Sequence, residues 1–280
     1  MITYFRIGQN GRLGNQMFQY ATLLSVALKN DYQHVVPASS VDRTYSAYYN
    51  ALTQKRELSG FELFDCFEIE CDLVNDIELA RNIRFSYQEI GNEFSNQVFK
   101  IPDFSNIDGY FQSEKYFADH ELEIRKQFVF KEEILDPARE YVKALRGQPL
   151  VSLHVRRGDY LALQAAHPLC TMDYYQAAIS EIEEILGNVK VLVISDDIQW
   201  CKQNFIGEKY IFSENCNDKE DLARMSLCNH NIIANSSFSW WGAWLNNHKN
   251  KLVYAPKNWF GPKFANHSLK DLFPKTWRVL

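Results

Sequence analysis

Glycine and proline are scarce in this sequence: 12 glycines and 8 prolines make up only 20 of its 280 residues. Collagen-like and disordered chains need a much larger share of these residues, so both classes are excluded. Apolar runs are short as well, and residues 191–194 and 232–234 are among the most hydrophobic stretches. A transmembrane helix needs roughly 18 apolar residues in a row, so we expect no membrane span. The balance of 46% hydrophobic and 23% charged residues is typical of a folded globular protein.

An excess of basic residues is also missing, since 30 Lys and Arg stand against 35 Asp and Glu and the net charge is −5. Nucleic-acid-binding domains usually carry a basic excess, so we expect no nucleic-acid partner. The N-terminus has no basic segment ahead of an apolar one, and the six scattered cysteines form no C-x-x-C pair. We therefore predict a cytoplasmic protein with reduced thiols. Peripheral association with a membrane stays an open alternative.

Several motifs of metal and nucleotide sites do not occur. The chain contains neither G-x-G-x-x-G nor a Walker motif, and its seven histidines show no H-x-x-x-H spacing. It also contains no D-x-D, the carboxylate pair that holds a divalent ion on a sugar-nucleotide diphosphate. The adjacent pair Asp196 and Asp197 would point to two different sides. We expect no metal and no cofactor, so that arginine and helix N-termini would balance the charge of any diphosphate ligand.

The second half of the chain has a regular pattern in which short apolar runs alternate with helical segments. Strands are predicted at 150–155, 190–194, 210–212, 231–234 and 251–255, and helices at 172–186, 197–205, 219–227 and 238–245. Thr171 and Gly187 are the predicted cap and stop of the first of these helices. Strands that alternate with helices predict a doubly wound parallel sheet covered on both faces.

The first half is less regular. A strand is predicted at 2–7, a glycine loop at 8–14, a helix after it, and a short strand that ends at Pro37. Further helices are predicted at 113–128 and at 137–146, the latter with Asp136 as its N-cap. Residues 39–106 carry no clear periodicity. We place the boundary near residues 147–149, which divides the chain into domains 1–148 and 149–280.

Three polar clusters follow predicted strands, where ligands bind in open parallel sheets. The first, residues 11–16, includes Gly14 and Asn15 and could place helix amides against an anion; an ordinary turn between strand and helix is the alternative. The second, residues 154–160, contains His154, Arg156 and Asp159. A guanidinium at the end of a strand suits a diphosphate, which it can grip with two hydrogen bonds.

The other residues of these clusters have structural alternatives. We interpret Arg157 as part of a structural Arg–Asp pair rather than a phosphate ligand. In the third cluster, residues 235–242, Ser236 and Ser237 could hold phosphate oxygens or serve only as N-caps. Trp240, Trp241 and Trp244 fit packing better than sugar binding, because they lie within the predicted helix.

Five segments together resemble the bacterial, inverting, GDP-fucose-dependent α-1,2-fucosyltransferases of glycosyltransferase family 11. They are residues 11–20, 109–117, 154–160, 195–197 and 235–245. The resemblance implies an α/β fold of the GT-B type, with two Rossmann-like domains facing a cleft. It assigns the acceptor side to domain 1–148 and the GDP-sugar donor to domain 149–280. The implied reaction moves L-fucose from GDP-fucose to the 2-hydroxyl of a galactose-type residue in a glycan, without metal.

The resemblance also implies roles for individual residues. Arg156 matches the arginine at the β-phosphate, and Gly14 with Asn15 matches the segment at the β-phosphate and sugar. Three further elements match nucleotide-binding positions: His154, the Ser236-Ser237 pair and Phe238. Our catalytic candidates are Arg156, Asn15 and Asp159, where Asp159 would accept the proton of the acceptor hydroxyl or, alternatively, hold the arginine loop. Two other functions stay open: a metal-independent transferase of another GDP-sugar, and a catalytically silent glycan- or nucleotide-binding protein on the same scaffold.

Overall fold

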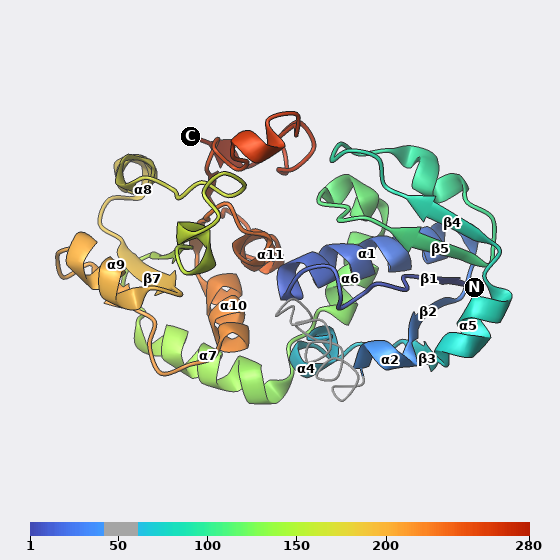
Figure 1. Ribbon diagram of the computed structural model, residues 1–280. Coiled ribbons are helices and arrows are strands. Elements are labelled where there is room, and N and C mark those ends of the chain that lie inside the picture. Colours follow the sequence, from blue (N-terminus) through green and yellow to red (C-terminus); the bar gives the residue numbers. More distant parts are fainter. Residues whose placement is uncertain (42–60) are drawn as a thin grey trace. The chain divides into compact units, whose positions relative to one another are not determined.

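A computed structural model describes residues 1–41 and 61–280 of the chain. The chain divides into two compact units. The N-terminal unit comprises Met1–Lys131 together with Lys270–Leu272, and the C-terminal unit comprises Glu132–Leu269 and Phe273–Leu280. Each unit contains one sheet whose strands run parallel, with helices packed around it (Figure 1). In the described residues no helix has both the length and the apolar character needed to cross a membrane.

The C-terminal unit is built on a six-stranded sheet with the order β11-β10-β9-β6-β7-β8. Its strands are β6 (Leu150–Val155), β7 (Lys190–Ser195), β8 (Tyr210–Phe212), β9 (His230–Ile232), β10 (Val253–Ala255) and β11 (Arg278–Val279). Its α-helices are α7 (Glu132–Ala144), α8 (Met172–Leu186), α9 (Ile198–Asn204), α10 (Asp218–Leu227) and α11 (Ser237–Leu245). The predicted alternation of strands and helices from residue 150 to residue 255 is confirmed, to within two residues at each end.

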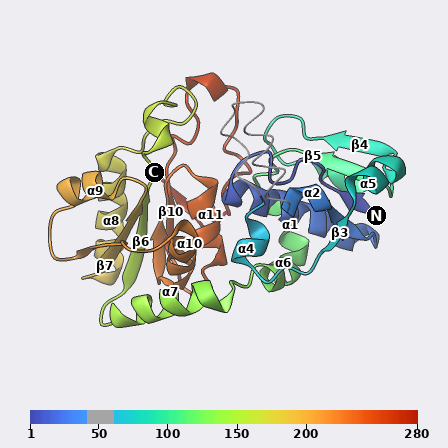
Figure 2. The same ribbon diagram turned by 60° about the horizontal axis from the view of Figure 1, so that its bottom comes forward.

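Side-chain alternation along β6 and β7 explains why both faces of this sheet are covered. Val151 and Leu153 pack with α8 and α9 in one core, whereas Leu150 and Leu192 pack with α7 and α10 in the other. Figure 2 shows these helices on the two sides of the sheet. Every residue of β6 is buried, Ser152 and His154 included, so the strand has no solvent-exposed face.

The strand order of the C-terminal unit contains a topological switch point. From β6 the chain adds β7 and β8 on one side, and then crosses to add β9, β10 and β11 on the other. β6 and β9 are neighbours, and the loops that leave their carboxyl ends run to opposite sides of the sheet. Open α/β sheets bind ligands in the crevice between two such loops. The residues that follow these two strands are the second and third polar clusters of the sequence.

The N-terminal unit has a five-stranded parallel sheet with the order β3-β2-β1-β5-β4. Its strands are β1 (Ile2–Thr3), β2 (His34–Pro37), β3 (Asp72–Val74), β4 (Phe85–Gln88) and β5 (Ser105–Asp108). Its α-helices are α1 (Leu13–Asn30), α2 (Ala38–Val41), α4 (Leu63–Cys66), α5 (Asp76–Asn82) and α6 (Glu121–Gln127). The chain leaves β1 toward β2 and β3, then crosses to form β4 at the opposite edge, and returns to β5 between β4 and β1. The pair β1 and β5 is thus the switch point of this sheet.

Three local predictions for the first half of the chain were wrong. β1 stops at Thr3 instead of continuing to Ile7, because the chain turns where the Ile7 amide donates to the Tyr4 carbonyl at 3.2 Å. Residues 113–128 form two short 3₁₀ turns before α6, rather than one helix. The interruption lets the adjacent rings of Tyr116 and Phe117 pack in different places, against Phe111 and Phe18.

The third wrong prediction concerns the start of α7. The helix begins at Glu132, so Asp136 is not its N-cap and Pro137 lies inside it. A proline there removes one backbone hydrogen bond. The earlier start places Ile134 and Ala138, four residues apart, on the buried face of the helix. As a result α7 belongs to the C-terminal unit, although it precedes the boundary expected near residues 147–149.

Candidate functional site

The loops that follow β6 and β9 are in direct contact. The Tyr160 hydroxyl donates to the Asn235 carbonyl oxygen at 3.1 Å, and the rings of His154 and Phe238 lie with their centroids 5.7 Å apart. The buried Asn235 amide also donates to the carbonyls of Pro168 at 2.8 Å and Trp259 at 3.2 Å. Two clusters that lie about eighty residues apart in the sequence therefore form one site at the switch point of the C-terminal sheet.

Arg156 is held between two carboxylates directly after the end of β6. Its Nη2 lies 2.7 Å from Asp159 Oδ1, and its Nη1 lies 3.0 Å from Asp196 Oδ2. The guanidinium carbon is 5.5 Å from the centre of the Tyr160 ring. Two carboxylates on different loops fix the plane of the guanidinium. Their negative charges offset its positive charge. Asp196 was not predicted to belong to the site, and the sequence signal for it is its place in the segment 195–197.

The neighbouring Arg157 has a structural environment, as expected. Its Nε donates to Asp197 Oδ2 at 3.1 Å, and its guanidinium stacks 4.0 Å from the centre of the Trp200 indole. The next residue, Gly158, packs closely against Asp196. A Cβ at position 158 would lie 2.7 Å from Asp196 Oδ2, which explains the glycine. A larger residue would push Asp196 away from Arg156.

His154 is a buried, neutral imidazole. Burial, assisted by the positive charge of Arg156, lowers the pKa of His154 to about 3. Within the described part of the chain, its Nδ1 atom has no hydrogen-bond partner. The ring is packed against Phe238 on the face of the sheet that α10 and α11 cover. His154 can therefore offer a neutral ring to a ligand, but it is poorly suited to carry a proton.

The third cluster forms the start of α11. Ser236 is the N-cap residue by position, yet its hydroxyl makes no capping hydrogen bond, and Ser237 is the first helical residue. The hydroxyl of Ser236 and the first amides of the helix are suitable donors for an anion. Trp240 and Trp241 are fully buried and Trp244 is 5% exposed, so the prediction that these rings pack in the core is confirmed.

The first cluster lies in the N-terminal unit, at the start of α1. Gly14 and Asn15 are the second and third residues of the helix, so Asn15 does not cap it. Its Oδ1 accepts a hydrogen bond from Gln112 Nε2 at 2.8 Å. Gly11 has a φ of +95°, and a Cβ there would come within 2.2 Å of Asn15 Nδ2. The glycine thus makes room for the Asn15 amide.

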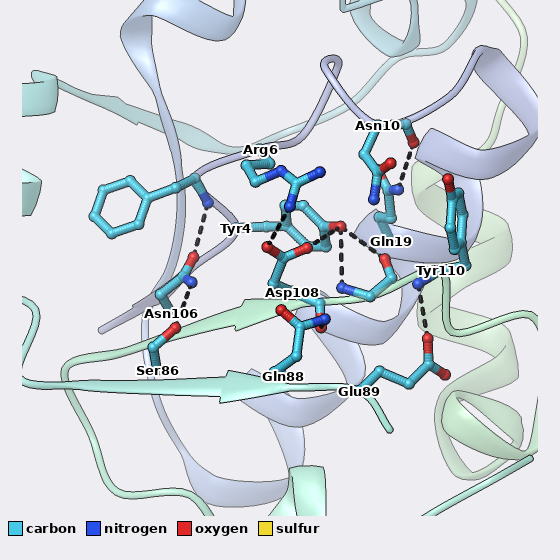
Figure 3. A network of polar contacts seen from close by, with 12 residues as sticks. Tyr4, Arg6, Asn10, Gln19, Ser86, Gln88, Glu89, Asn106, Asp108 and Tyr110 are labelled. Carbon is cyan, nitrogen blue, oxygen red and sulfur yellow. Dashed lines mark hydrogen bonds and ion pairs between the residues drawn. The ribbon is translucent and has the colours of Figure 1, made fainter. Parts of the chain in front are cut away.

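The first amide of α1 already has an anionic partner, because the Leu13 amide donates to Glu62 Oε2 at 3.1 Å. Gln112, which contacts Asn15, lies in the loop after β5. The loops that leave β1 and β5 therefore meet at the switch point of this sheet, as the corresponding loops do in the C-terminal unit. Figure 3 shows the polar network on the β5 side, where Arg6 pairs with Asp108 at 3.1 Å.

Metal-binding side chains do not gather in the described residues: none of their His, Cys, Asp and Glu side chains form a group of three or more suited to an ion. The cationic groups at the C-terminal switch point are Arg156 and Arg157, each paired with carboxylates.

Two parallel sheets in two units, each with polar loops at its switch point, define the architecture of GT-B glycosyltransferases. Solved structures agree: apo POFUT1 superimposes with a TM-score of 0.52 over 91% of this chain and 97% of its own, at 13% identity. The fucosyltransferase NodZ from Bradyrhizobium gives a TM-score of 0.50 over 86% of this chain and 91% of its own, also at 13% identity. At this identity the likeness establishes the fold.

The family follows from the sequence comparison. The model of glycosyl transferase family 11 matches residues 1–280, and the chain belongs to this family. An alpha-1,2-colitosyltransferase of Escherichia coli is 33% identical over 95% of both chains. The O-antigen biosynthesis glycosyltransferase WbnK of the same species is 31% identical over 96% of this chain and 97% of its own. Galactoside alpha-(1,2)-fucosyltransferase 2 of Rattus norvegicus is 26% identical over 86% of this chain and 66% of its own.

Proposed function

We propose that this protein transfers L-fucose, with inversion, from GDP-β-L-fucose to the 2-hydroxyl of a galactose-type residue in a glycan. Family membership and relatives that are named as α-1,2-transferases support this proposal. The observation that carries it is Arg156, which two carboxylates orient at the switch point of a parallel sheet. That position suits the diphosphate of a nucleotide sugar.

In this proposal the C-terminal domain binds the donor. Arg156 grips the β-phosphate, and the start of α11, with Ser236 and Ser237, holds phosphate oxygens. His154 and Phe238 form a neutral, partly aromatic surface for the nucleotide. Gly14 and Asn15 serve the β-phosphate and the sugar, and the N-terminal domain supplies the acceptor contacts.

The chemistry follows from where charge develops. Breakage of the bond between C1 of the sugar and the phosphate oxygen builds negative charge on the β-phosphate. A guanidinium that is already oriented stabilises this charge without reorganisation, and can contribute several kcal/mol to the reduction of the barrier. We propose that this arginine performs the task of a metal ion, so that the reaction needs none.

The two carboxylates beside Arg156 have a positioning role in this scheme. Asp159 is a candidate for the base, with the holding of the arginine loop as its alternative. Its 2.7 Å ion pair with Arg156 supports the holding role, because the pair engages its carboxylate with the guanidinium. Asp196 completes the arrangement on the other side of the guanidinium.

A second candidate function changes only the donor sugar. The relative that is 33% identical over 95% of both chains is a colitosyltransferase. Colitose differs from fucose by the absence of one hydroxyl, at C3. A donor site that makes no hydrogen bond to that hydroxyl would accept either sugar, whereas a site that does would reject the deoxy sugar strongly.

A donor panel tests both candidates. The purified protein is incubated in excess EDTA with GDP-fucose, GDP-colitose, GDP-mannose or UDP-galactose, with lactose as acceptor, and the linkage is read by NMR. We expect transfer of fucose to the galactose 2-hydroxyl at full rate in chelator. Preference for GDP-colitose would select the second candidate. Activity that disappears in EDTA and returns with Mn²⁺ would overturn the metal-free mechanism, and donor binding without turnover would point to the silent alternative.

A further inference from the structure

An exposed aromatic residue lies at the switch point of the N-terminal sheet. Tyr110 lies in the loop directly after β5, and its residue is 47% exposed. Its neighbours Gly109 and Phe111 are both buried. The loop therefore presents one ring outward from an otherwise buried stretch of chain.

Buried side chains hold the backbone of this loop. The Tyr4 hydroxyl donates to the Gly109 carbonyl at 2.7 Å and lies 3.1 Å from the Gly109 amide. Glu89 Oε2 accepts from the Tyr110 amide at 2.7 Å (Figure 3) and from the Phe111 amide at 2.9 Å. Burial raises the pKa of both Tyr4 and Glu89, and the two amides oppose the shift of the carboxyl. The backbone of three successive residues is thus anchored by side chains, which fixes the segment that carries the Tyr110 ring.

The backbone at Phe111 is in the left-handed region, with a φ of +51°. This conformation is unfavourable for a residue with a large side chain and persists only where the surroundings impose it. Here it turns the Phe111 ring into the core, where it packs edge-on against Tyr116 at a centroid distance of 5.2 Å. Backbone strain of this kind is concentrated at functional sites. Here the strained backbone accompanies a buried Phe111 and an exposed Tyr110.

The surroundings of Tyr110 favour a neutral ligand. Glu89 contacts its backbone, and the nearby Asp108 is balanced by Arg6. The next polar group along the loop is the uncharged Gln112 amide, which contacts Asn15. Carboxylates close to the ring disfavour an anionic ligand on it. A sugar suits these surroundings, because its hydroxyls form hydrogen bonds with carboxylates and amides and its C–H face packs on an aromatic ring. Galactose has such a face, because its axial 4-hydroxyl leaves the C–H bonds at C3, C4 and C5 together on one side.

We propose that Tyr110 is the aromatic platform on which the galactose ring of the acceptor stacks, an inference that rests on the function proposed above. Phe111 and Glu89 are positioning residues for this platform. The ligand class is a neutral β-galactoside, and lactose is the probe.

The test compares Tyr110→Ala, Tyr110→Leu and Tyr110→Phe with a matched control, Phe85→Ala, which removes a 44% exposed ring from strand β4 of the same unit. For Tyr110→Ala we expect the KM for lactose to rise about tenfold, the upper range for one aromatic contact. Tyr110→Leu should behave similarly, because it keeps bulk without the ring face. Tyr110→Phe and Phe85→Ala should stay near the wild type. The KM for GDP-fucose and the rate of donor hydrolysis without acceptor should be unchanged in all four variants.

The outcomes separate this inference from the proposed function. An unchanged KM for lactose in Tyr110→Ala and Tyr110→Leu would overturn the inference, and so would an equal loss in donor hydrolysis, which would assign the ring to the donor. If the wild type neither transfers nor hydrolyses GDP-fucose, the proposed function fails. Lactose binding by saturation-transfer NMR then decides on Tyr110: binding by the wild type that the alanine variant lacks supports the platform, and any other result overturns it.

Discussion

The switch points of the two units share a topology but differ in the groups that meet there. At the C-terminal one, two arginines and three aspartates lie within hydrogen-bond range of one another. At the N-terminal one, the amides of Asn15 and Gln112 meet, and the charged groups beside them are the Arg6–Asp108 pair and Glu89. A diphosphate needs oriented positive charge, whereas a sugar needs donors, acceptors and ring faces. We propose that the C-terminal switch point serves the diphosphate and that the N-terminal one serves the sugars, with Asn15 serving the β-phosphate as well, and mutations can test this division.

The largest effect is expected at Arg156. Replacement by lysine should lower kcat/KM by about 10³-fold, because a point charge cannot reproduce two oriented hydrogen bonds to a phosphate. Replacement by alanine should be only slightly worse. Steady-state kinetics with GDP-fucose and lactose measures both changes.

Arg157 provides the matched control. Arg157→Lys loses its stack on Trp200 and should cost about 1 kcal/mol of stability, with activity within about tenfold of the wild type. If the lysine variant at 156 keeps most of its turnover, or if the two positions respond alike, Arg156 is not the clamp of the β-phosphate.

Asn15 should show the next largest effect, and only in turnover. An interaction that strengthens as charge develops lowers kcat rather than ground-state binding, so Asn15→Ala should reduce kcat by roughly 10²-fold. The GDP dissociation constant should change by less than about threefold. Calorimetric titration of GDP, run beside steady-state kinetics, separates the two quantities.

Since Asn15 does not cap α1, its loss should leave the unfolding free energy nearly unchanged. Gln112→Ala removes the partner of Asn15 at 2.8 Å and is the matched variant, with a smaller expected loss of turnover. Normal kcat in Asn15→Ala would limit Asn15 to a structural role in the N-terminal unit.

Asp196 should have an intermediate effect, because it acts through Arg156. Asp196→Asn keeps an oxygen for the Arg157 amide but removes the charge 3.0 Å from Arg156. We expect kcat to fall about tenfold, within the range for one charge-assisted hydrogen bond, with a smaller change in the KM for the donor. Asp197→Asn is the control, since asparagine also caps helix α9 well. Equal losses in the two variants would show that Asp196 does not position the arginine specifically.

The smallest effect concerns stability and pH. The pKa of His154 is lowered to about 3, so the unfolded chain binds a proton on this residue more readily than the folded one. The stability that this difference provides is complete above the ordinary pKa of 6.5 and decreases as the pH falls toward 3. Between pH 6.5 and 4.5 the unfolding free energy should drop by on the order of 2 kcal/mol through His154.

Chemical denaturation at several pH values measures this slope, and His154→Phe should flatten it. His230 has its pKa lowered to about 4 by burial and by His248, so part of the slope should persist in the variant. An identical slope in both proteins would mean that His154 does not stay neutral when folded.

The C-terminal unit was predictable to a large extent because its strands are buried on both faces. Apolar runs such as β6 and β7 stand out in the sequence, and Thr171 and Gly187 mark the ends of α8 as expected. The N-terminal unit was harder, since β1 has only two residues and β4 is a four-residue strand that is largely exposed. The side chain of Asn106 replaces a strand bond by accepting from the Phe5 amide at 2.9 Å, which no local pattern reveals.

The candidate site divides in the same way. The types of residue that diphosphate chemistry requires were visible in the order of the chain, and Arg156 could be distinguished from Arg157 by its position after a strand. The partners of these residues were not visible. Asp196 lies about forty residues after its partner Arg156, and Gln112 lies about one hundred residues after its partner Asn15. Asn235 forms hydrogen bonds with Tyr160, Pro168 and Trp259, which are all far from it in the sequence or on other loops.

What the sequence by itself determined is therefore the class of fold, the alternation of elements in the second half and the chemical character of each polar cluster. These depend on local properties: burial, periodicity and residue type. The tertiary structure alone decided which clusters meet, because strand order places β9 beside β6 and β5 beside β1. It also decided which groups orient Arg156 and that Tyr110 points outward, since these depend on hydrogen bonds between distant segments and on a backbone conformation at Phe111 that only the surrounding core imposes.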